Sequence, residues 1–284
     1  MATAYATTHN LKLGFSTWVC PQWTCAAIVD GMQQYGFDGV ELRIGKGHLH
    51  GVELDSPPDY LNDVRKQFDA ANVAISCIAT SFAFSSPDIT ERQKTINQVK
   101  QCLRMADSLG APYIRVFGGE MPPGLESTGV IDYIAEALDE CTEYAEKEKM
   151  RSMILLETQG PFSHSKYVNE IMSQVFSKKL GVLWDVVHPM RVLEPVEDTY
   201  DQICDYVKHV HVRDRAFNED RTRLVDCEPG EGFIPLPKVV DLLKSGNFRG
   251  YLSLEIVQDG IDPDEILPQY GKFLKELVKP MARV

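Results

Sequence analysis

The sequence predicts an α/β fold, a single (β/α)8 barrel that spans residues 1–284. Two observations lead to this prediction. Short apolar runs alternate with long amphipathic segments along the whole chain, which is typical of strands that are each followed by a helix. Eight such pairs fit into the chain at a mean spacing of about 35 residues, and no linker or low-complexity segment separates them. We therefore expect one domain.

The apolar runs are expected to be strands of a parallel sheet that is buried on both faces. Each run is apolar at successive positions and rich in β-branched residues, whereas a half-exposed strand would alternate apolar with polar residues. In chain order, the predicted strands are residues 11–15, 39–42, 73–79, 113–117, 153–156, 181–184, 207–212 and 251–254.

The segments between these runs are expected to be helices that cover the sheet, because they carry apolar residues at helical spacing on one face. In chain order, the predicted helices are residues 24–35, 58–71, 88–109, 127–149, 164–177, 196–206, 236–245 and 263–278. Gly110 marks the end of the third helix, since glycine readily adopts the left-handed conformation found there. Two stretches rich in Gly and Pro, 118–124 and 229–237, are expected to be long loops.

A doubly wound open sheet is the alternative fold for alternating strands and helices. That fold usually places a glycine-rich, phosphate-binding turn after its first strand. Here the corresponding turn reads Ser16-Thr17-Trp18-Val19-Cys20, and the chain contains neither a GxGxxG nor a Walker motif. The sequence therefore favours the closed (β/α)8 TIM barrel.

Composition argues against several classes of partner. A formal net charge of −12 and a pI of about 5.1 disfavour binding to nucleic acid or to an anionic membrane. No apolar run approaches the roughly 18 residues that a transmembrane helix needs, and residues 1–10 lack the basic and apolar segments of a signal peptide. The seven cysteines include no CxxC pair, which favours reduced thiols and a cytoplasmic location.

Four consecutive predicted strands finish with side chains of the kinds that bind metals: Glu157, Asp185, His211 and Glu255. Active sites of (β/α)8 barrels lie at the carboxyl ends of the strands. Side chains alternate along a strand, so residues i and i+2 share a face. The four residues sit at matching positions in this alternation, and we expect them to converge inside the barrel mouth.

Three carboxylates packed together would repel one another, and a divalent cation would remove that repulsion. Three oxygen donors and one imidazole suit one Mn²⁺ or Mg²⁺ ion, with Co²⁺ or Zn²⁺ as alternatives; we expect Mn²⁺. Such an ion would keep open positions for substrate oxygens.

Each ligand-type residue also has a simpler interpretation when it is taken alone. A carboxylate at the end of a strand often forms a salt bridge or caps a loop, and a single histidine is often a hydrogen-bonded core residue. We expect His209 to pack in a lower layer of the barrel and His164 to lie at the surface. Asp214 would only orient its neighbours. Arg115 points inward by the same alternation, either as a buried counter-ion or as a substrate clamp.

Six motifs make the chain resemble the xylose isomerase-like TIM-barrel superfamily, in its sugar phosphate isomerase/epimerase branch. The resemblance covers nearly the whole chain. The motifs are GFDGVE at 36–41, LLET at 155–158, WDVVHP at 184–189, HVHVRD at 209–214, GEGFIP at 230–235 and GYLSLE at 250–255.

The resemblance implies roles for individual residues. The metal ligands would be Glu157, Asp185, His211 and Glu255. Glu157 and Glu255 would also be the catalytic pair that transfers protons. His188 would bind a substrate oxygen or lie beside the metal, and Arg213 would contact a substrate oxygen. Glu41 would contact the substrate or support the site by a hydrogen bond.

The chain lacks residues found in two kinds of superfamily member, and this restricts the reactions that we expect it to catalyse. Several dehydratase-like relatives carry a histidine two residues after the glutamate of strand five, where this chain has Gln159. Endonuclease IV needs additional histidines at the ends of strands three and four, where this chain reads Ala79-Thr80-Ser81 and Phe117-Gly118-Gly119. Together with the acidic charge, this argues against a role in DNA repair.

The resemblance implies a metal-dependent sugar isomerase or epimerase that acts on a ketose or a related hydroxy-ketone. One glutamate would remove a proton beside the carbonyl to give an enediolate, and the other would return it to the opposite face. The alternative is a metal-dependent lyase or dehydratase on a keto-sugar or keto-cyclitol, in which the same enediolate expels a β-substituent. A third hypothesis is a barrel that only binds sugars or assembles, which retention of all four ligands disfavours.

The expected partner is an unphosphorylated sugar or polyol ketone, because no phosphate-binding motif occurs. By analogy with its relatives, the chain is a possible homo-oligomer. Five aromatic residues are expected either to form a wall against the sugar or to pack loops onto the barrel rim: Trp18, Trp23, Phe82, Phe84 and Phe117.

Overall fold

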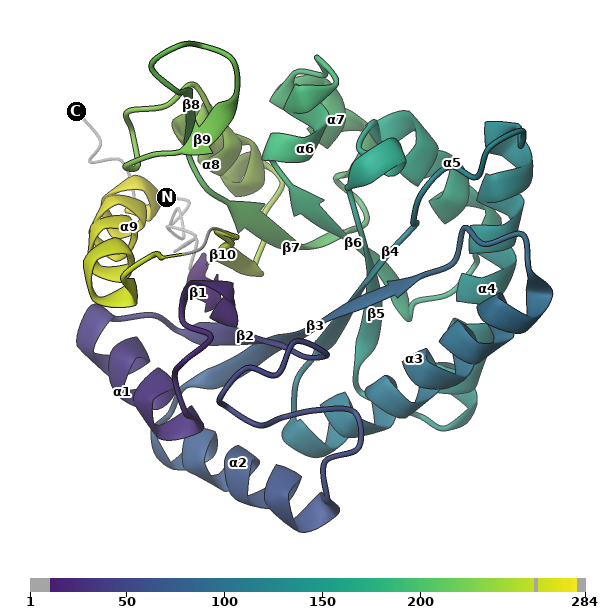
Figure 1. The fold of residues 1–284 in the computed structure, drawn as a ribbon, viewed down its shortest axis with the longest axis horizontal. Coiled ribbons are helices and arrows are strands. Elements are labelled where there is room, and N and C mark those ends of the chain that lie inside the picture. The colour runs from purple at the N-terminus through teal and green to yellow at the C-terminus, as the bar shows by residue number, and fades with distance from the viewer. Residues whose placement is uncertain (1–10, 258–259, 280–284) are drawn as a thin grey trace, which may run out of the picture.

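Eight parallel strands close into a barrel in the computed structural model, which describes residues 11–257 and 260–279. Around the barrel, each strand is hydrogen-bonded to the next in the order β1-β10-β7-β6-β5-β4-β3-β2, and the helices surround it (Figure 1). This arrangement confirms the predicted TIM barrel and excludes the open doubly wound sheet. The N-terminal residues examined above for a signal peptide lie outside the described part.

The barrel strands fall close to the predicted runs. They are β1 (Lys12–Ser16), β2 (Gly39–Arg43), β3 (Ala74–Ala83), β4 (Tyr113–Phe117), β5 (Met153–Glu157), β6 (Leu180–Asp185), β7 (Val207–Val212) and β10 (Tyr251–Leu254). Two further strands, β8 (Arg215–Phe217) and β9 (Leu224–Asp226), form an antiparallel hairpin that follows β7 and lies beside α8 in Figure 1.

Helices follow the strands on the outside of the barrel. They are α1 (Cys25–Tyr35), α2 (Pro58–Ala70), α3 (Ile89–Leu109), α4 (Ser127–Lys147), α5 (Ser165–Gln174), α6 (Val187–Arg191), α7 (Val196–Ile203), α8 (Leu236–Ser245) and α9 (Pro263–Val278). Two short 3₁₀ helices, Thr17–Val19 and Gly160–Phe162, follow β1 and β5.

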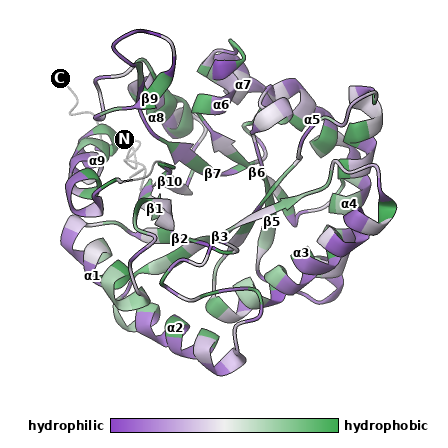
Figure 2. Cartoon of the chain, viewed as in Figure 1, coloured by the Kyte–Doolittle hydropathy of each residue, from purple (hydrophilic) through white to green (hydrophobic). Residues whose placement is uncertain are grey.

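Local sequence signals set the ends of the long helices. Thr24 begins α1 with a side chain that accepts a hydrogen bond from the backbone of Ala27, and Gly36 ends it with a φ of 72°. Asp88 caps α3 in the same way, and Gly110 ends that helix with a φ of 75°, as predicted. Figure 2 shows that the helices turn their hydrophilic residues outward.

The register of the strands places their polar ends near the same rim of the barrel. His211 on β7 pairs with Asp185 on β6 and with Ser253 on β10. Glu157 on β5 pairs with Phe117 on β4 and with Leu183 on β6. Because these strands are parallel neighbours, their carboxyl ends open at the same mouth of the barrel.

Several local features differ from the expectations, among them the short helix α6, which was not predicted, and α5, which ends at Gln174 rather than at residue 177. The third strand runs on to Ala83 after an irregular pairing with β4, so it reaches past the predicted end at residue 79. The hairpin β8–β9 was not predicted, because each of its strands has three residues and the segment between them is polar. The seventh strand is preceded by α7, which ends at Ile203 rather than at residue 206.

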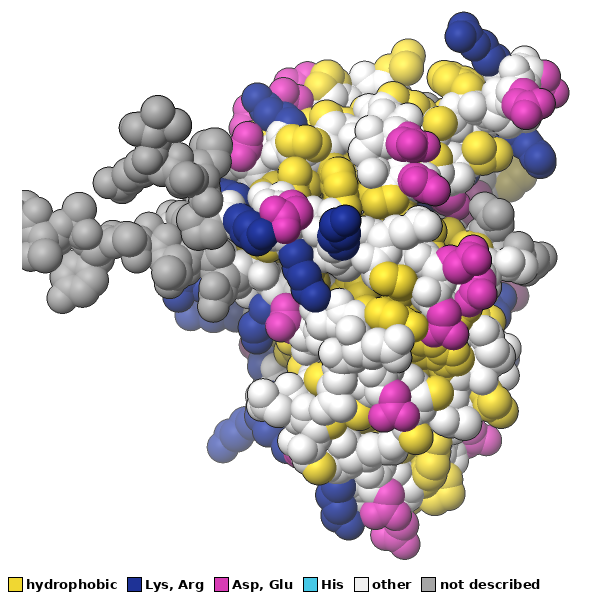
Figure 3. Space-filling view, turned by 90° about the vertical axis from the view of Figure 1, so that its left-hand side faces the viewer, with side chains coloured by type: hydrophobic (Ala, Val, Ile, Leu, Met, Phe, Trp, Pro, Cys, Tyr) yellow, Lys and Arg dark blue, Asp and Glu magenta, His cyan; other side chains and the backbone are white. Residues whose placement is uncertain are grey.

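The surface carries charged side chains of both signs. Figure 3, which views the left-hand side of Figure 1, shows acidic and basic side chains interspersed among apolar ones. Within the described part of the chain, no helix has both the length and the apolar character to span a bilayer. All seven cysteines are free thiols.

Asp107 provides a test of how α3 is tied to β5. Its Oδ1 accepts hydrogen bonds from the backbone N–H groups of Arg151 and Ser152, at 2.8 and 2.9 Å, and from the Ser152 hydroxyl at 3.0 Å. Burial opposes ionisation, but these bonds outweigh it and lower the pKa of Asp107 below its usual range.

We predict that Asp107→Asn lowers the free energy of unfolding at pH 7 by about 1 kcal/mol. The native pKa is depressed, so the stabilisation is present above the unfolded-state pKa and is lost as the pH falls through the native value. Denaturant titrations should show the difference from wild type shrinking below about pH 4. The exposed Asp132→Asn is the control, and a difference that is independent of pH would contradict this account.

Candidate functional site

Four side chains from four successive barrel strands meet at the mouth. Glu157 ends β5, Asp185 ends β6, His211 lies near the end of β7 and Glu255 follows β10. Each offers a ligand atom, and these atoms all lie within 4.8 Å of one another. The structure thus brings together the four residues that the alternation along the strands predicts to converge.

His211 lies at the centre of this cluster. Its Nδ1 is 3.5 Å from Oε1 of Glu157 and 3.3 Å from Oε2 of Glu255. The side chains of His211 and Asp185 are fully buried, and Glu157 and Glu255 are at most 7 % exposed. The cluster is therefore shielded from bulk water.

Several atoms of the cluster have no hydrogen-bond partner. They are both carboxylate oxygens of Glu157, Oδ2 of Asp185 and Nδ1 of His211, and all are buried. Buried polar atoms are normally hydrogen-bonded, so this group of atoms without hydrogen-bond partners needs an explanation. One divalent cation could take one ligand atom from each of the four residues, and three carboxylates with one imidazole fit such an ion.

Asp185 is oriented by the start of the helix that follows it. Its Oδ1 accepts hydrogen bonds from the backbone N–H groups of Val187 and His188, at 2.8 and 3.2 Å. This leaves Oδ2 free to face the cluster, where Nη1 of Arg213 lies 2.9 Å away. Asp185 therefore uses one carboxylate oxygen to cap the start of α6 and directs the other oxygen to the cluster.

Charges in the cluster favour ionised acids. Burial alone would raise the pKa of Glu255, but His211 and then Arg115 and Arg213 lower it below its usual range. Burial likewise opposes the ionisation of Asp185, and Arg213 and His188 lower its pKa. Asp185 and Glu255 are therefore carboxylates rather than neutral acids.

Glu41 lies in the layer below the cluster. It is fully buried, with Oε2 3.0 Å from Nε2 of His211 and Oε1 3.0 Å from Nε2 of His209, and Ser253 donates a hydrogen bond to it. These contacts occupy the side of His211 that faces away from the cluster. The geometry favours the supporting role for Glu41 over contact with substrate. His209 packs below, as expected.

Two arginines face the acids. Nε of Arg115 is 3.1 Å from Oε2 of Glu157, and its Nη2 is 3.5 Å from Oε1 of Glu255. Nη1 of Arg213 contacts Asp185 and lies 3.4 Å from Oε2 of Glu255. Arg115 is therefore a buried counter-ion, one of the two roles expected for it.

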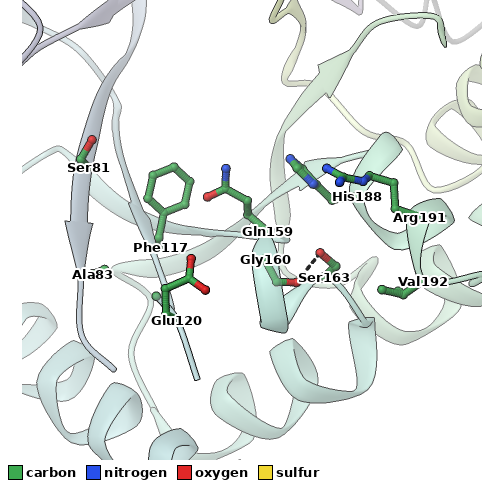
Figure 4. A pocket seen from close by; sticks show the side chains of 11 residues that line it. Ser81, Ala83, Phe117, Glu120, Gln159, Gly160, Ser163, His188, Arg191 and Val192 are labelled. Atoms are coloured by element: carbon green, nitrogen blue, oxygen red, sulfur yellow. Dashed lines mark hydrogen bonds between the residues drawn. The ribbon is translucent and has the colours of Figure 1, made fainter. Parts of the chain in front are cut away.

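A pocket of about 650 Å³ opens beside the cluster (Figure 4). His188 joins the two, because it lines the pocket and its Nε2 lies 3.7 Å from Oδ2 of Asp185. Gln159 lies between Phe117 and His188 in this view, and Glu120 and Arg191 stand on opposite sides of the pocket. Its volume is in the range that encloses small organic ligands.

Sequence reasoning missed most of this pocket. Glu120, Ser163 and Arg191 lie in loops or in the short helix α6, where neither periodicity nor a motif distinguishes them from surface residues. Phe117 was expected as one of five rim aromatics, and the pocket includes it. Phe84 is fully buried instead, and Trp18 lies in a separate cavity of about 700 Å³ together with His48.

The remaining singled-out residues have structural roles. His164 is partly exposed, caps α5 and lies 3.1 Å from Glu194. Asp214 accepts hydrogen bonds from the backbone N–H groups of Gly230, Gly232 and Ile234, and so organises the loop after the hairpin. This agrees with the expectation that Asp214 orients its neighbours.

Comparison with known proteins agrees with the barrel fold. The sequence profile described as "Xylose isomerase-like TIM barrel" matches residues 29–277. Fructoselysine 3-epimerase from Escherichia coli O157:H7 is 22% identical over 236 residues, which cover 79% of this chain and 82% of the relative.

Two solved structures have similar folds. The probable 3-DHS dehydratase AsbF from Bacillus anthracis superposes with a TM-score of 0.77 at 17% identity, covering 93% of this chain and 99% of that one. The IOLI protein, whose structure contains a bound zinc atom, superposes with a TM-score of 0.76 at 17% identity, covering 94% and 96%.

Glu41 provides a test of the layer beneath the cluster. Hydrogen bonds from a carboxylate to a metal-binding histidine fix its ring and tautomer, and their loss typically costs 10–100-fold in metal affinity. We predict that Glu41→Gln weakens Mn²⁺ binding by roughly that factor while the protein stays folded, as measured by calorimetric titration and circular dichroism. Glu219→Gln, in the exposed turn between β8 and β9, is the matched control. Unchanged Mn²⁺ affinity in Glu41→Gln would refute the supporting role.

Proposed function

Because this chain belongs to the xylose isomerase-like TIM-barrel family, we propose that it is a divalent-metal-dependent isomerase or epimerase of a ketose or related hydroxy-ketone. One observation carries the proposal. Two buried glutamates, Glu157 and Glu255, approach the same point from strands on either side of Asp185 and His211, and each has an oxygen within 3.5 Å of Nδ1 of His211. The pocket of about 650 Å³ beside them leaves room for a sugar.

The four residues would hold one ion, for which we propose Mn²⁺, with Mg²⁺, Co²⁺ or Zn²⁺ as alternatives. When bound, a divalent ion supplies Lewis acidity to the carbonyl of the substrate, which makes the neighbouring C–H more acidic. The bound zinc in the similar IOLI structure supports a bound metal ion in this chain as well.

Glu157 and Glu255 would carry the proton. One removes it from the carbon beside the carbonyl, and the other returns a proton to the opposite face of the enediolate. Return to the same carbon gives an epimer, and return to the neighbouring carbon gives an isomer. The side chains come from β5 and from the end of β10, so they approach from different directions.

His188 and Arg213 would bind substrate oxygens. His188 stands between the cluster and the pocket, so its ring can donate to a hydroxyl of a sugar that extends from the metal into the pocket. Arg213 directs Nη1 into the cluster and would donate to an oxygen held there. The free cysteines suit the reducing cytoplasm that we propose for the protein.

The resemblance to fructoselysine 3-epimerase supports epimerisation, and the fold similarity to the probable 3-DHS dehydratase keeps elimination as the second candidate. In elimination, the same enediolate would expel a β-substituent, which needs an acid for the leaving group. The position where several dehydratase-like relatives carry histidine is Gln159, which lines the pocket and does not titrate. Epimerisation is therefore our first choice.

Incubation of the Mn²⁺-loaded protein with a panel of ketoses in D₂O tests the reaction. We predict deuterium incorporation beside the carbonyl together with a new stereoisomer or aldose. Glu157→Gln and Glu255→Gln should each lower the rate by roughly 10²–10⁴-fold, because each removes a proton-transferring carboxylate. Glu219→Gln should retain the wild-type rate.

A dehydrated or otherwise eliminated product without any stereoisomer would favour the lyase. Absence of both exchange and product, together with no metal in the purified protein, would contradict an enzymatic role and favour a barrel that only binds sugars or assembles.

A further inference from the structure

Arg115 occupies an unusual position inside the barrel. It lies in the middle of β4, where it pairs in register with Ala79 on β3 and Leu155 on β5, one layer below Glu157. Only 2 % of its side chain is exposed. Its guanidinium lies 4.2 Å from the centre of the Phe117 ring, and Phe117 lines the pocket. Arg115 therefore faces the acids rather than the space where substrate would bind.

Each glutamate of the proposed catalytic pair divides its two oxygens in the same way. Glu157 directs Oε2 to Arg115 and Oε1 to Nδ1 of His211. Glu255 directs Oε1 to Arg115 and Oε2 to Nδ1 of His211. A single guanidinium thus contacts both glutamates from below and leaves one oxygen of each to face the point where the ligand atoms converge.

Arg115 keeps its charge in this environment. A guanidinium group stays protonated in proteins, and here the carboxylates of Glu157 and Glu255 lie against it. A fixed positive charge in a water-poor site interacts strongly with its neighbours, because neither solvent nor salt screens it well.

We propose that Arg115 is a positioning residue that fixes the orientation of Glu157 and Glu255 for catalysis. By the same positive charge, it lowers the affinity of the site for its divalent ion. The three carboxylates of the cluster are in contact with two guanidinium groups, those of Arg115 and Arg213. With both guanidinium groups present, one of the three negative charges of the carboxylates is left uncompensated. Without Arg115, two negative charges are left uncompensated. This inference rests on the proposed function, since it requires that the cluster binds a divalent cation.

The sign of the effect on metal affinity separates this role from a merely structural one. If Arg115 only maintained the shape of the site, its loss would scatter the ligands and weaken metal binding. If its charge opposes the ion, its loss strengthens metal binding, because the ion then relieves a larger repulsion among the carboxylates. In both cases the metal-free protein becomes less stable, so stability alone does not distinguish them.

The experiment measures Mn²⁺ affinity by calorimetric titration, with Mn²⁺ alone as the probe, on the full-length wild-type chain and three variants. Arg115→Met removes the charge and keeps a side chain of similar length. Arg115→Lys keeps the charge but cannot contact both glutamates through one planar guanidinium group. Arg104→Met, the control, removes a charge from the exposed face of α3. Turnover of whichever ketose the wild type converts is measured in parallel.

We expect Arg115→Met to bind Mn²⁺ at least about tenfold more tightly than wild type, and yet to have a kcat at least about tenfold lower, because its glutamates are no longer held. The melting temperature of Arg115→Met should fall without Mn²⁺ and recover when Mn²⁺ is added. Arg115→Lys should keep Mn²⁺ affinity within about threefold of wild type while kcat falls, and Arg104→Met should match wild type in both.

Equal or weaker Mn²⁺ binding by folded Arg115→Met would overturn the inference while leaving the proposed function intact, provided that wild type binds Mn²⁺. If Arg115→Met does not fold, Arg115→Lys decides: a loss of Mn²⁺ affinity as large as its loss of kcat would overturn the inference. A wild-type protein that binds no divalent ion would contradict the metal centre, and the inference with it.

Discussion

The repulsion among three buried carboxylates is the constraint on which the rest of the site depends. Glu157, Asp185 and Glu255 are brought within ligand distance of one another by the closure of the barrel, where water does not screen them. Such an arrangement is stable only if positive charge is supplied from the surroundings. The protein supplies it with guanidinium groups from β4 and from the segment after β7, and an imidazole on β7 lies at the centre.

Layers below the cluster make this arrangement rigid. Glu41 and Ser253 fix the far side of His211, and Arg115 fixes one oxygen of each glutamate. One oxygen of each glutamate therefore faces Nδ1 of His211, where the ligand atoms of the cluster converge. Preorganised acceptors of this kind favour binding of a cation and positioning of a substrate beside it, since little conformational entropy is lost when either binds.

The barrel and the convergence of its ligand-type residues could be predicted from the sequence, because both follow from strong local signals. Continuous apolar runs locate buried strands, and the two-residue alternation assigns Asp185, His211 and Glu255 to one face. The depth of Glu41 could not be predicted, because it depends on the stagger of β2 against β7 across the barrel. The hairpin β8–β9 and the pocket residues Glu120 and Arg191 depend on loop conformation, for which the sequence carries no periodic signal.

The central claim is that the four strand-end residues form one cation site. A crystal structure of the protein soaked with Mn²⁺, with data collected at the manganese absorption edge, tests it most directly. The account predicts a single strong anomalous peak within bonding distance of Glu157, Asp185, His211 and Glu255. It would be contradicted by a site without any peak, or by a peak elsewhere while these side chains point away from one another.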